Sequence, residues 1–220
     1  MIVTKIERQK RNPHRVNIFL DNEFKFGIHE ATLTKFGLRN GDELDQKIIE
    51  TISIQEEYHL AHSKALQLIS RRLRTERELR FKLLEKEFQP KAVDFVIEKL
   101  RKSGLVDDSR FARAYVHDIQ LRKPAGARFI QQQLRLKGVP LSIIQTILHE
   151  HFDDETTQKL ALKVASTLTK RFKSSRKKID SFKQRQRIIQ LLLRRGFDWQ
   201  TINTVLPKLF GRAPTVNQEN

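Results

Sequence analysis

Apolar and polar residues alternate along the start of the chain, and the apolar positions take a helical period after about residue 45. Three short runs, at 2–9, 15–20 and 23–28, show the alternation typical of half-buried strands. Asp21 and Asn22 separate the last two runs and suit the positive φ angles of a tight hairpin. The pattern therefore predicts three strands in one small antiparallel sheet.

One face of this sheet is expected to be apolar, with Phe24 and Phe26 both lying on it. Three strands alone are only marginally stable. We therefore expect a short helix, ending at the left-handed residue Gly37, to cover the sheet.

The helical part of the chain contains one apolar frame three times. When Phe88, Val139 and Phe197 are aligned, apolar residues recur 9 and 5 positions before them and 5, 8 and 9 positions after them. The earlier positions fit one face of a helix, the later ones fit one face of a second helix, and the aligned residues lie in the turn between them. The recurring residues are Leu79, Ile130 and Ile188; Leu83, Leu134 and Leu192; Val93, Ile144 and Ile202; Val96, Ile147 and Val205; and Ile97, Leu148 and Leu206. The alternative to a repeat is that apolar residues fall at these spacings by chance, as they can in any helical protein.

A further amphipathic stretch precedes each of these helix pairs, so the repeating unit is predicted to be a three-helix module. We expect a mainly α protein with a strand-rich unit at 1–45, modules at 46–107, 108–153 and 154–212, and a disordered tail at 213–220. A module of about 50 residues buries little surface, and stacking of modules into an elongated array is expected to complete the cores.

The turns inside the modules support this alignment. Gly138 and Gly196 stand where a helix end favours a left-handed residue, and each follows a cation that suits the negative end of the helix dipole. Glu87 occupies the same position in the first module, so that turn is expected to be built differently. Thr75 to Glu78 forms a capping-box pattern that begins the second helix of the first module.

Two adjacent aspartates, Asp107 and Asp108, lie in the stretch "SGLVDDSRFARAYV". As structural residues they mark a helix junction, with Asp107 as the N-cap of the next helix and both carboxylates at its positive end. As a catalytic or Mg²⁺-binding pair they would need more carboxylates or a histidine nearby, and the neighbouring sequence has none. The structural interpretation is favoured.

The residues around these aspartates are expected to complete the junction. Gly104 is predicted to end the preceding helix in a left-handed conformation, with Leu105 folding back onto Leu100. Val106 and Phe111 stand at the two positions of a hydrophobic staple.

Charge is distributed unevenly along the chain, whose net charge is +17. Residues 1–60 carry nine Lys and Arg against ten Asp and Glu, so residues 61–220 hold +18. This asymmetry predicts a polyanionic or acidic partner for the helical part, with nucleic acid first and an acidic protein surface second.

Other features exclude several classes of protein. The chain has no cysteine, no apolar run long enough to span a bilayer and no signal-peptide core, so we expect a soluble cytoplasmic protein with no membrane association. The histidine pairs His59 with His62 and His149 with His151 lack a third ligand, and no phosphate loop or nucleophile motif is present. We expect no metal, no cofactor and no enzymatic activity.

Basic clusters are the remaining functional signal. They fall in or near the second helix of each module, and stacked modules are expected to align them into one positive stripe whose binding weakens steeply with salt. Aromatic residues are not interleaved with them, which favours contact with a nucleic-acid backbone or a protein over base stacking. For any one cation the alternative is solvation or local pairing, as for Glu76 with Arg80. The candidates are Arg71, Arg72, Arg74, Arg77, Arg122, Lys123, Arg128, Arg135, Lys137, Lys170, Arg171, Arg176, Lys177, Lys178, Arg185, Arg187, Arg194 and Arg195.

The motifs at 104–116 and 126–139, "GLVDDSRFARAYV" and "GARFIQQQLRLKGV", resemble the signature of the RecX family, which regulates the RecA recombinase. The resemblance covers about residues 57–210 and departs from the family pattern at "PAG", residues 124–126. The matching positions are Gly104, Leu105, Asp107, Asp108, Phe111, Ala112, Tyr115, Ile130, Leu134, Lys137 and Gly138.

The resemblance implies a function that the residue pattern does not. RecX proteins are tandem three-helix repeats without catalytic activity that bind in the groove of the RecA filament on single-stranded DNA and limit ATP hydrolysis, strand exchange and filament growth. The resemblance also implies a monomer that acts in homologous recombination, DNA repair and the SOS response. Some members of the family also bind single- or double-stranded DNA. The alternatives are a nucleic-acid-binding protein that acts without RecA and, less favoured, a nuclease that uses Asp107 and Asp108.

Overall fold

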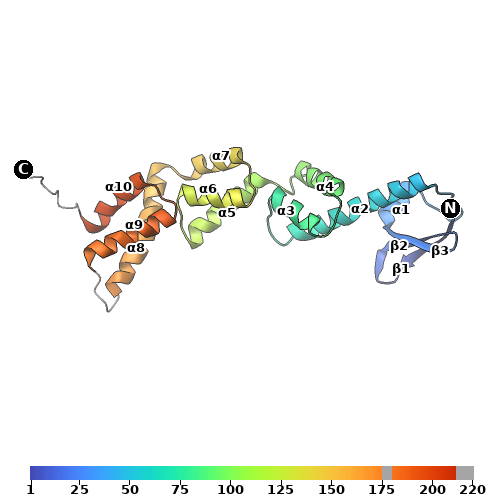
Figure 1. The fold of residues 1–220 in the computed structure, drawn as a ribbon, viewed down its shortest axis with the longest axis horizontal. Helices are drawn as coiled ribbons and strands as arrows, with labels where there is room; N and C mark the ends of the chain where they lie inside the picture. The colour runs from blue at the N-terminus through green and yellow to red at the C-terminus, as the bar shows by residue number, and fades with distance from the viewer. Residues whose placement is uncertain (175–179, 212–220) are drawn as a thin grey trace, which may run out of the picture. The chain divides into compact units, whose positions relative to one another are not determined.

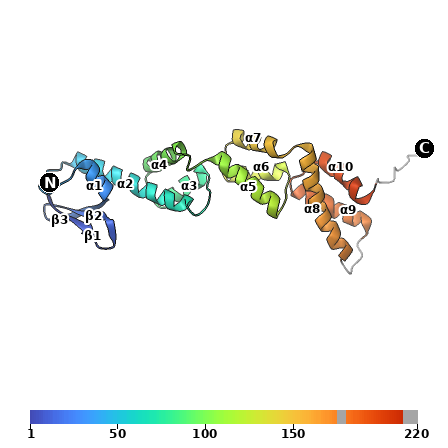
Figure 2. The ribbon, with the colours of Figure 1, turned by 180° about the vertical axis from the view of Figure 1, so that it is seen from behind.

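The computed structural model describes residues 1–174 and 180–211. The chain divides into two compact units, and each is described by itself. The first contains Met1–Arg74 and Glu78–Val106, and the second contains Thr75–Arg77 and the chain from Asp107 onward. Figures 1 and 2 show the order of the elements along the chain from opposite sides.

The first unit begins with a three-stranded antiparallel sheet in the order β1-β2-β3. Its strands are β1 (Val3–Gln9), β2 (Asn12–Leu20) and β3 (Glu23–His29). Asp21 and Asn22 have φ angles of 50° and 72°, as expected for the tight hairpin between β2 and β3.

Phe24 is not on the buried face of the sheet, contrary to the alternation in the sequence. Phe26 pairs with Ile18, but the next pair is Phe24 with Phe19, so β3 has one extra residue there. This bulge reverses the face of Phe24, because successive strand residues point to opposite sides. Its side chain is 58% exposed and contacts the ring of Phe19 edge-on, whereas Phe26 packs against the core.

Two helices cover the sheet. The short helix α1 (Glu30–Phe36) ends at Gly37 with φ 61°, as predicted. The long helix α2 (Gln46–Ile69) starts at the N-cap Asp45 and places Ile49 and Ile52 in the core of the sheet.

A buried ion pair joins the sheet to α2. Arg15 of β2 donates to the Glu56 carboxylate at 2.6 Å, and both side chains are largely buried. The other Glu56 oxygen accepts from the backbone N–H of His29 at 2.8 Å and from the Thr32 hydroxyl at 3.2 Å. Glu56 therefore ties two strand residues and α1 to α2.

The rest of the described chain is helical and forms three further cores, one for each predicted three-helix repeat. The first module is α2 with α3 and α4, the second is α5 to α7, and the third is α8 to α10. The remaining helices are α3 (Glu76–Leu84), α4 (Pro90–Lys102), α5 (Asp108–Arg122), α6 (Ala127–Leu136), α7 (Leu141–His151), α8 (Asp154–Ser174), α9 (Ser181–Arg194) and α10 (Trp199–Phe210).

The repeated apolar frame is the set of residues that builds these cores. Leu79, Ile130 and Ile188 are each fully buried, and each lies in a different core. The mainly helical fold with three three-helix domains and an N-terminal three-stranded sheet is therefore confirmed. The domain boundaries stay predictions, and the predicted tail at 213–220 lies outside the described residues.

The turn of the first module is built like the other two, contrary to expectation. Glu87 has φ 62°, close to the values of 82° for Gly138 and 78° for Gly196. In all three turns the left-handed residue donates its N–H over 2.9 Å to the carbonyl three residues earlier. A left-handed conformation is costly for a residue with a Cβ, so the geometry is kept in spite of the glutamate.

The end of α4 has the predicted Schellman geometry, but a different side chain packs behind it. Gly104 has φ 68°, and the N–H of Leu105 donates to the Leu100 carbonyl at 3.0 Å. Leu105 is 52% exposed, and it is Val106, 2% exposed, that packs in the core with Leu100. Phe111, its predicted staple partner, belongs to the core of the second module.

Candidate functional site

The strongest candidate site is a basic groove of about 580 Å³ in the second unit. Its walls are α8 and α9, which lie side by side in Figures 1 and 2 and are in contact. Each helix contributes positions i, i+3, i+4 and i+7, which form one face of a helix. The residues are Val164, Thr167, Leu168 and Arg171 from α8, and Arg187, Gln190, Leu191 and Arg194 from α9.

Residues from the second module complete the groove. Arg122 and Lys123 at the end of α5, Pro124 after them, and Arg195 after α9 also line it. The Arg195 guanidinium donates to the Lys123 carbonyl at 3.2 Å, which holds the two segments together.

Among the residues that the structure describes, six cations line the groove and no carboxylate does. Within residues 1–174 and 180–211, none of the six forms an ion pair with an acidic side chain. Elsewhere in the same unit, Arg113 contacts Glu150 at 3.0 Å and Lys159 contacts Glu155 at 2.5 Å. The groove therefore concentrates positive charge that the described part of the protein does not neutralise, and such a concave site attracts anions.

A smaller basic hollow of about 280 Å³ lies elsewhere in the second unit. Arg77, Arg128 and Arg135 line it together with Gln131, Gln132 and Leu136. Arg77 and Arg128 occupy equivalent positions in consecutive modules, 51 residues apart. The repeat thus places two arginines at the same site.

Two of the predicted cations in the first unit are used for internal bonds. Arg72 contacts Glu78 at 2.8 Å and donates to the Leu73 carbonyl. Arg74 donates to the Leu68 carbonyl at 3.1 Å, and burial, with Arg72 nearby, lowers the pKa of its guanidinium. The ion partner of Arg80 is Asp94 of α4, rather than the helix neighbour Glu76.

The remaining candidates are not brought into the groove or the hollow. Arg71 is exposed in the first unit, and Lys137, Lys170 and Arg185 line neither site. Arg176, Lys177 and Lys178 lie outside the described residues. The single positive stripe along all modules stays a prediction.

Four uncharged polar residues among the described lining were missed in the sequence. Thr167 and Gln190 in the groove, and Gln131 and Gln132 in the hollow, offer polar groups between the cations. Their spacing of three or four residues from an arginine on the same helix was the signal available. Charge clusters alone do not show which face of a helix is used.

Asp107 and Asp108 have separate structural partners. Asp107 is the N-cap of α5 and accepts from the backbone N–H groups of Ser109 and Arg110 at 2.8 and 3.0 Å. Asp108 is 7% exposed and accepts from the N–H of Glu76, the first residue of α3, at 2.9 Å. Burial raises the pKa of Asp108, and the Glu76 N–H opposes that rise. Neither carboxylate lines the groove.

Histidines also take structural positions. The Nδ1 atom of His29 accepts from the Ala31 N–H at the start of α1, and its ring stacks on that of His59 at 5.6 Å. Burial, with His29 nearby, lowers the pKa of His59. Across the described ranges, no three His, Asp or Glu side chains are grouped so as to hold a metal ion.

Four family models match successive parts of the chain. The regulatory protein RecX N-terminal domain matches residues 1–45, and the first, second and third three-helix domains of RecX match 61–100, 107–148 and 155–206. The chain belongs to the RecX family. The three RecX helical domains correspond to the three cores described above.

Curated relatives and solved structures agree with this assignment. Regulatory protein RecX of Clostridium acetobutylicum is 35% identical over 213 residues, covering 94% of this chain and 96% of that protein. The RecX of Leuconostoc mesenteroides is 34% identical and covers 94% and 75%. A crystal structure of regulatory protein RecX matches with a TM-score of 0.75 at 32% identity, covering 93% of this chain and 98% of that chain. The RecX of Lactobacillus salivarius, at 24% identity and a TM-score of 0.63, shows the same fold.

The RecX family is one of regulatory proteins, and a regulatory role follows for this chain.

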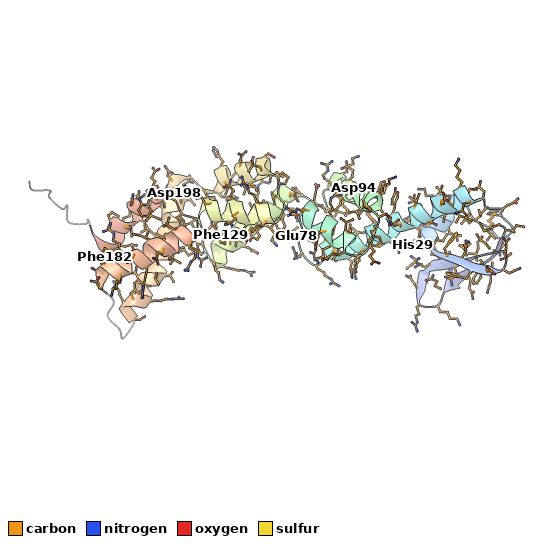
Figure 3. The ribbon with its side chains drawn as sticks, viewed as in Figure 1. His29, Glu78, Asp94, Phe129, Phe182 and Asp198 are labelled. Carbon is orange, nitrogen blue, oxygen red and sulfur yellow. The ribbon has the colours of Figure 1, made fainter. Side chains whose placement is uncertain are left out.

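The side chains of both units are drawn in Figure 3, where Phe129 of α6 and Asp198, the N-cap of α10, are labelled. Among the described helices, none combines the length and apolarity that crossing a membrane requires.

Proposed function

We propose that this chain is a non-enzymatic regulator of the RecA recombinase. It binds in the groove of the RecA filament on single-stranded DNA and inhibits ATP hydrolysis, strand exchange and filament extension. The observation that carries the proposal is the match of four RecX domains in order along the chain. The basic groove supports it, because a filament on DNA offers both acidic side chains and phosphates.

The proposal includes the setting in which the protein works. It acts as a monomer in the cytoplasm, without a metal or cofactor, in homologous recombination, DNA repair and the SOS response. Its effect comes from binding alone. The engagement of both Asp107 and Asp108 with backbone N–H groups at the starts of helices supports this part of the proposal.

The test is DNA-dependent ATP hydrolysis by the cognate RecA. Adding the full chain at substoichiometric to stoichiometric ratios is expected to lower the hydrolysis rate, with single-stranded DNA held constant. An unchanged rate over this range would contradict the proposal. Heat-unfolded chain at the same concentration controls for binding of DNA by an unfolded basic polypeptide.

A second candidate is a basic nucleic-acid-binding protein that acts without RecA. The six cations of the groove, which have no acidic partner in the described part of the chain, favour it. Tight DNA binding with a steep salt dependence, together with unaffected RecA hydrolysis, would select this candidate over the first.

A further inference from the structure

We infer that the groove between α8 and α9 binds the phosphodiester backbone of a nucleic-acid strand, and not an acidic protein surface. The inference rests on the proposed function, in which the protein works on a filament built on DNA. It names nucleic acid as the class of ligand that the groove binds, and the phosphate groups of its backbone as the atoms that are contacted.

The charge density of the groove is the first argument. The lining positions of each helix, Val164 to Arg171 and Arg187 to Arg194, span seven residue steps, which is about 10 Å of helix. A B-form strand carries one phosphate in about 3.4 Å of axis, so this length matches about three phosphates. Five of the six cations are arginines, whose forked donors bind a phosphate in a bidentate manner, so two cations are available for each phosphate. A nucleic-acid strand presents phosphates at this density along its whole length.

The uncharged lining residues agree with backbone contact. None of the described lining residues is aromatic, so the described groove offers no platform for stacking of bases. Val164, Leu168 and Leu191 give it an apolar floor, against which sugar rings and arginine stems can pack. The Gln190 amide lies between the cations and supplies a neutral donor of the kind that contacts phosphate and sugar oxygens.

The contrast with other surface cations of the unit is the second argument. Arg113 and Lys159 are exposed and have carboxylate partners, whereas Arg187 and Arg194 are exposed and have none among the described residues. Clustered like charges oppose folding, so six of them in one groove are best explained by a polyanion that neutralises them.

The test measures DNA binding by the full chain without RecA. Fluorescence anisotropy of a labelled oligo(dT), and of a duplex of the same length, is recorded over a series of salt concentrations. Removing two groove cations in Arg187→Gln/Arg194→Gln is expected to lower the slope of log K against log salt by about 1.4 for the single strand and about 1.8 for the duplex. Affinity for the single strand at 0.1 M salt falls roughly 20-fold. Comparison of binding to the oligo(dT) and to the duplex shows whether the groove takes a single strand or a paired one.

Two variants make the test specific. Arg113→Gln/Lys159→Gln removes the same charge from the same unit but from paired cations, and it is expected to leave the salt slope close to that of the wild type. Arg122→Gln/Arg171→Gln repeats the groove experiment from α5 and α8, in case the α9 variant fails to fold. Oligonucleotides of mixed sequence are expected to show the same losses as oligo(dT), because only the backbone is contacted.

Three results would overturn the inference. They are no binding of either DNA by the wild-type chain, equal losses in the groove and control variants, and displacement of DNA by poly-glutamate of equal charge at the same concentration. Failure of the inference is separable from failure of the proposed function. If RecA hydrolysis is inhibited but groove variants bind DNA like the wild type, only the inference fails. If groove-dependent DNA binding is found but RecA hydrolysis is unchanged, only the proposed function fails.

Discussion

The backbone N–H of Gly126 donates a hydrogen bond of 2.8 Å to the carbonyl of Arg195, which joins the turn of the third module to the start of α6 in the second. The equivalent residues one repeat earlier are also in contact. Thr75 stands 51 residues before Gly126 and Lys137 stands 58 residues before Arg195, and the Thr75 hydroxyl donates to the Lys137 carbonyl at 2.7 Å. One contact is made by a backbone group and the other by a side chain. Both contacts lie within the second unit, and in both the acceptor is the carbonyl of the residue before a left-handed glycine, Gly138 or Gly196, while the donor differs.

Gly196 is expected to be essential to the later of these junctions. It has φ 78°, and a Cβ added to it would lie 2.3 Å from the backbone nitrogen of Phe129. Gly196→Ala combines left-handed strain with a backbone clash and is expected to lower the free energy of unfolding by about 2–4 kcal/mol. Urea denaturation followed by the fluorescence of Trp199, the single tryptophan, measures this.

Gly37→Ala, followed by circular dichroism, is the control for that experiment. Gly37 is left-handed, with φ 61° and ψ 26°, and no neighbouring atom lies within 4 Å of an added Cβ, so only the conformational cost of about 1 kcal/mol applies. Equal losses in the two variants would show that the approach to Phe129 is not the cause.

Glu87→Gly is expected to stabilise the first unit. Glycine adopts the φ of 62° without steric cost, and this gain exceeds the loss of backbone entropy, so the free energy of unfolding rises by about 1 kcal/mol. Thermal unfolding followed by circular dichroism measures the change. Glu87→Ala keeps the Cβ and is expected to give no such gain; a gain of the same size would mean that the glutamate charge, and not the conformation, is unfavourable.

Asp108 is expected to make stability depend on pH. Because burial raises its pKa, the folded state holds this proton to a higher pH than the unfolded chain does, and the contribution of Asp108 to stability falls as the pH rises above about 4. Asp108→Asn keeps an oxygen that accepts from the Glu76 N–H and removes the buried charge. At pH 7 this variant should be at least as stable as the wild type.

Denaturation of both proteins at several values between pH 4 and pH 7 tests this expectation. The advantage of the Asn variant should shrink toward pH 4. Asp108→Ala, which leaves the Glu76 N–H without its acceptor, is expected to lose about 1–3 kcal/mol at pH 4, and this loss should shrink as the pH rises because the contribution of Asp108 itself falls. An Asn variant that is less stable than the wild type at pH 7 by a similar amount would contradict the assignment.

Asp107→Ala is expected to cost about 1 kcal/mol through loss of the α5 cap and to leave DNA and RecA binding near wild type. Trp199 fluorescence and the anisotropy assay measure the two effects. Cleavage of DNA that requires Mg²⁺ and disappears in this variant would instead support the nuclease interpretation.

Glu56→Ala is expected to destabilise the first unit by about 3–5 kcal/mol. The substitution leaves the largely buried Arg15 without its ion partner and removes an acceptor from the His29 N–H. Arg15→Met/Glu56→Gln removes both charges but keeps an oxygen that accepts from the His29 N–H, and it is expected to be much closer to the wild type, because no uncompensated charge remains. Equal losses in the two variants would indicate lost packing and not an unpaired charge.

Hydrophobic periodicity alone determined which elements form and which residues build the cores. The spacing around Phe88, Val139 and Phe197 specified three helix pairs, because burial on one helix face follows from local backbone geometry. The same reasoning failed at Phe24 and Glu87. The bulge at Phe24 depends on pairing with a neighbouring strand, which local pattern does not contain. At Glu87 the left-handed turn forms although the residue type disfavours it, so the residue type alone was misleading.

The sequence by itself also determined that the helical part is basic and that it resembles RecX. Only the tertiary structure decided which cations are available to a partner. Arg72 and Arg187 look alike in their clusters, yet one bonds to Glu78 while the other faces a groove formed with α8 and the end of α5. Whether a charge is neutralised depends on what lies within a few ångströms of it, and those neighbours come from elements far apart in the chain.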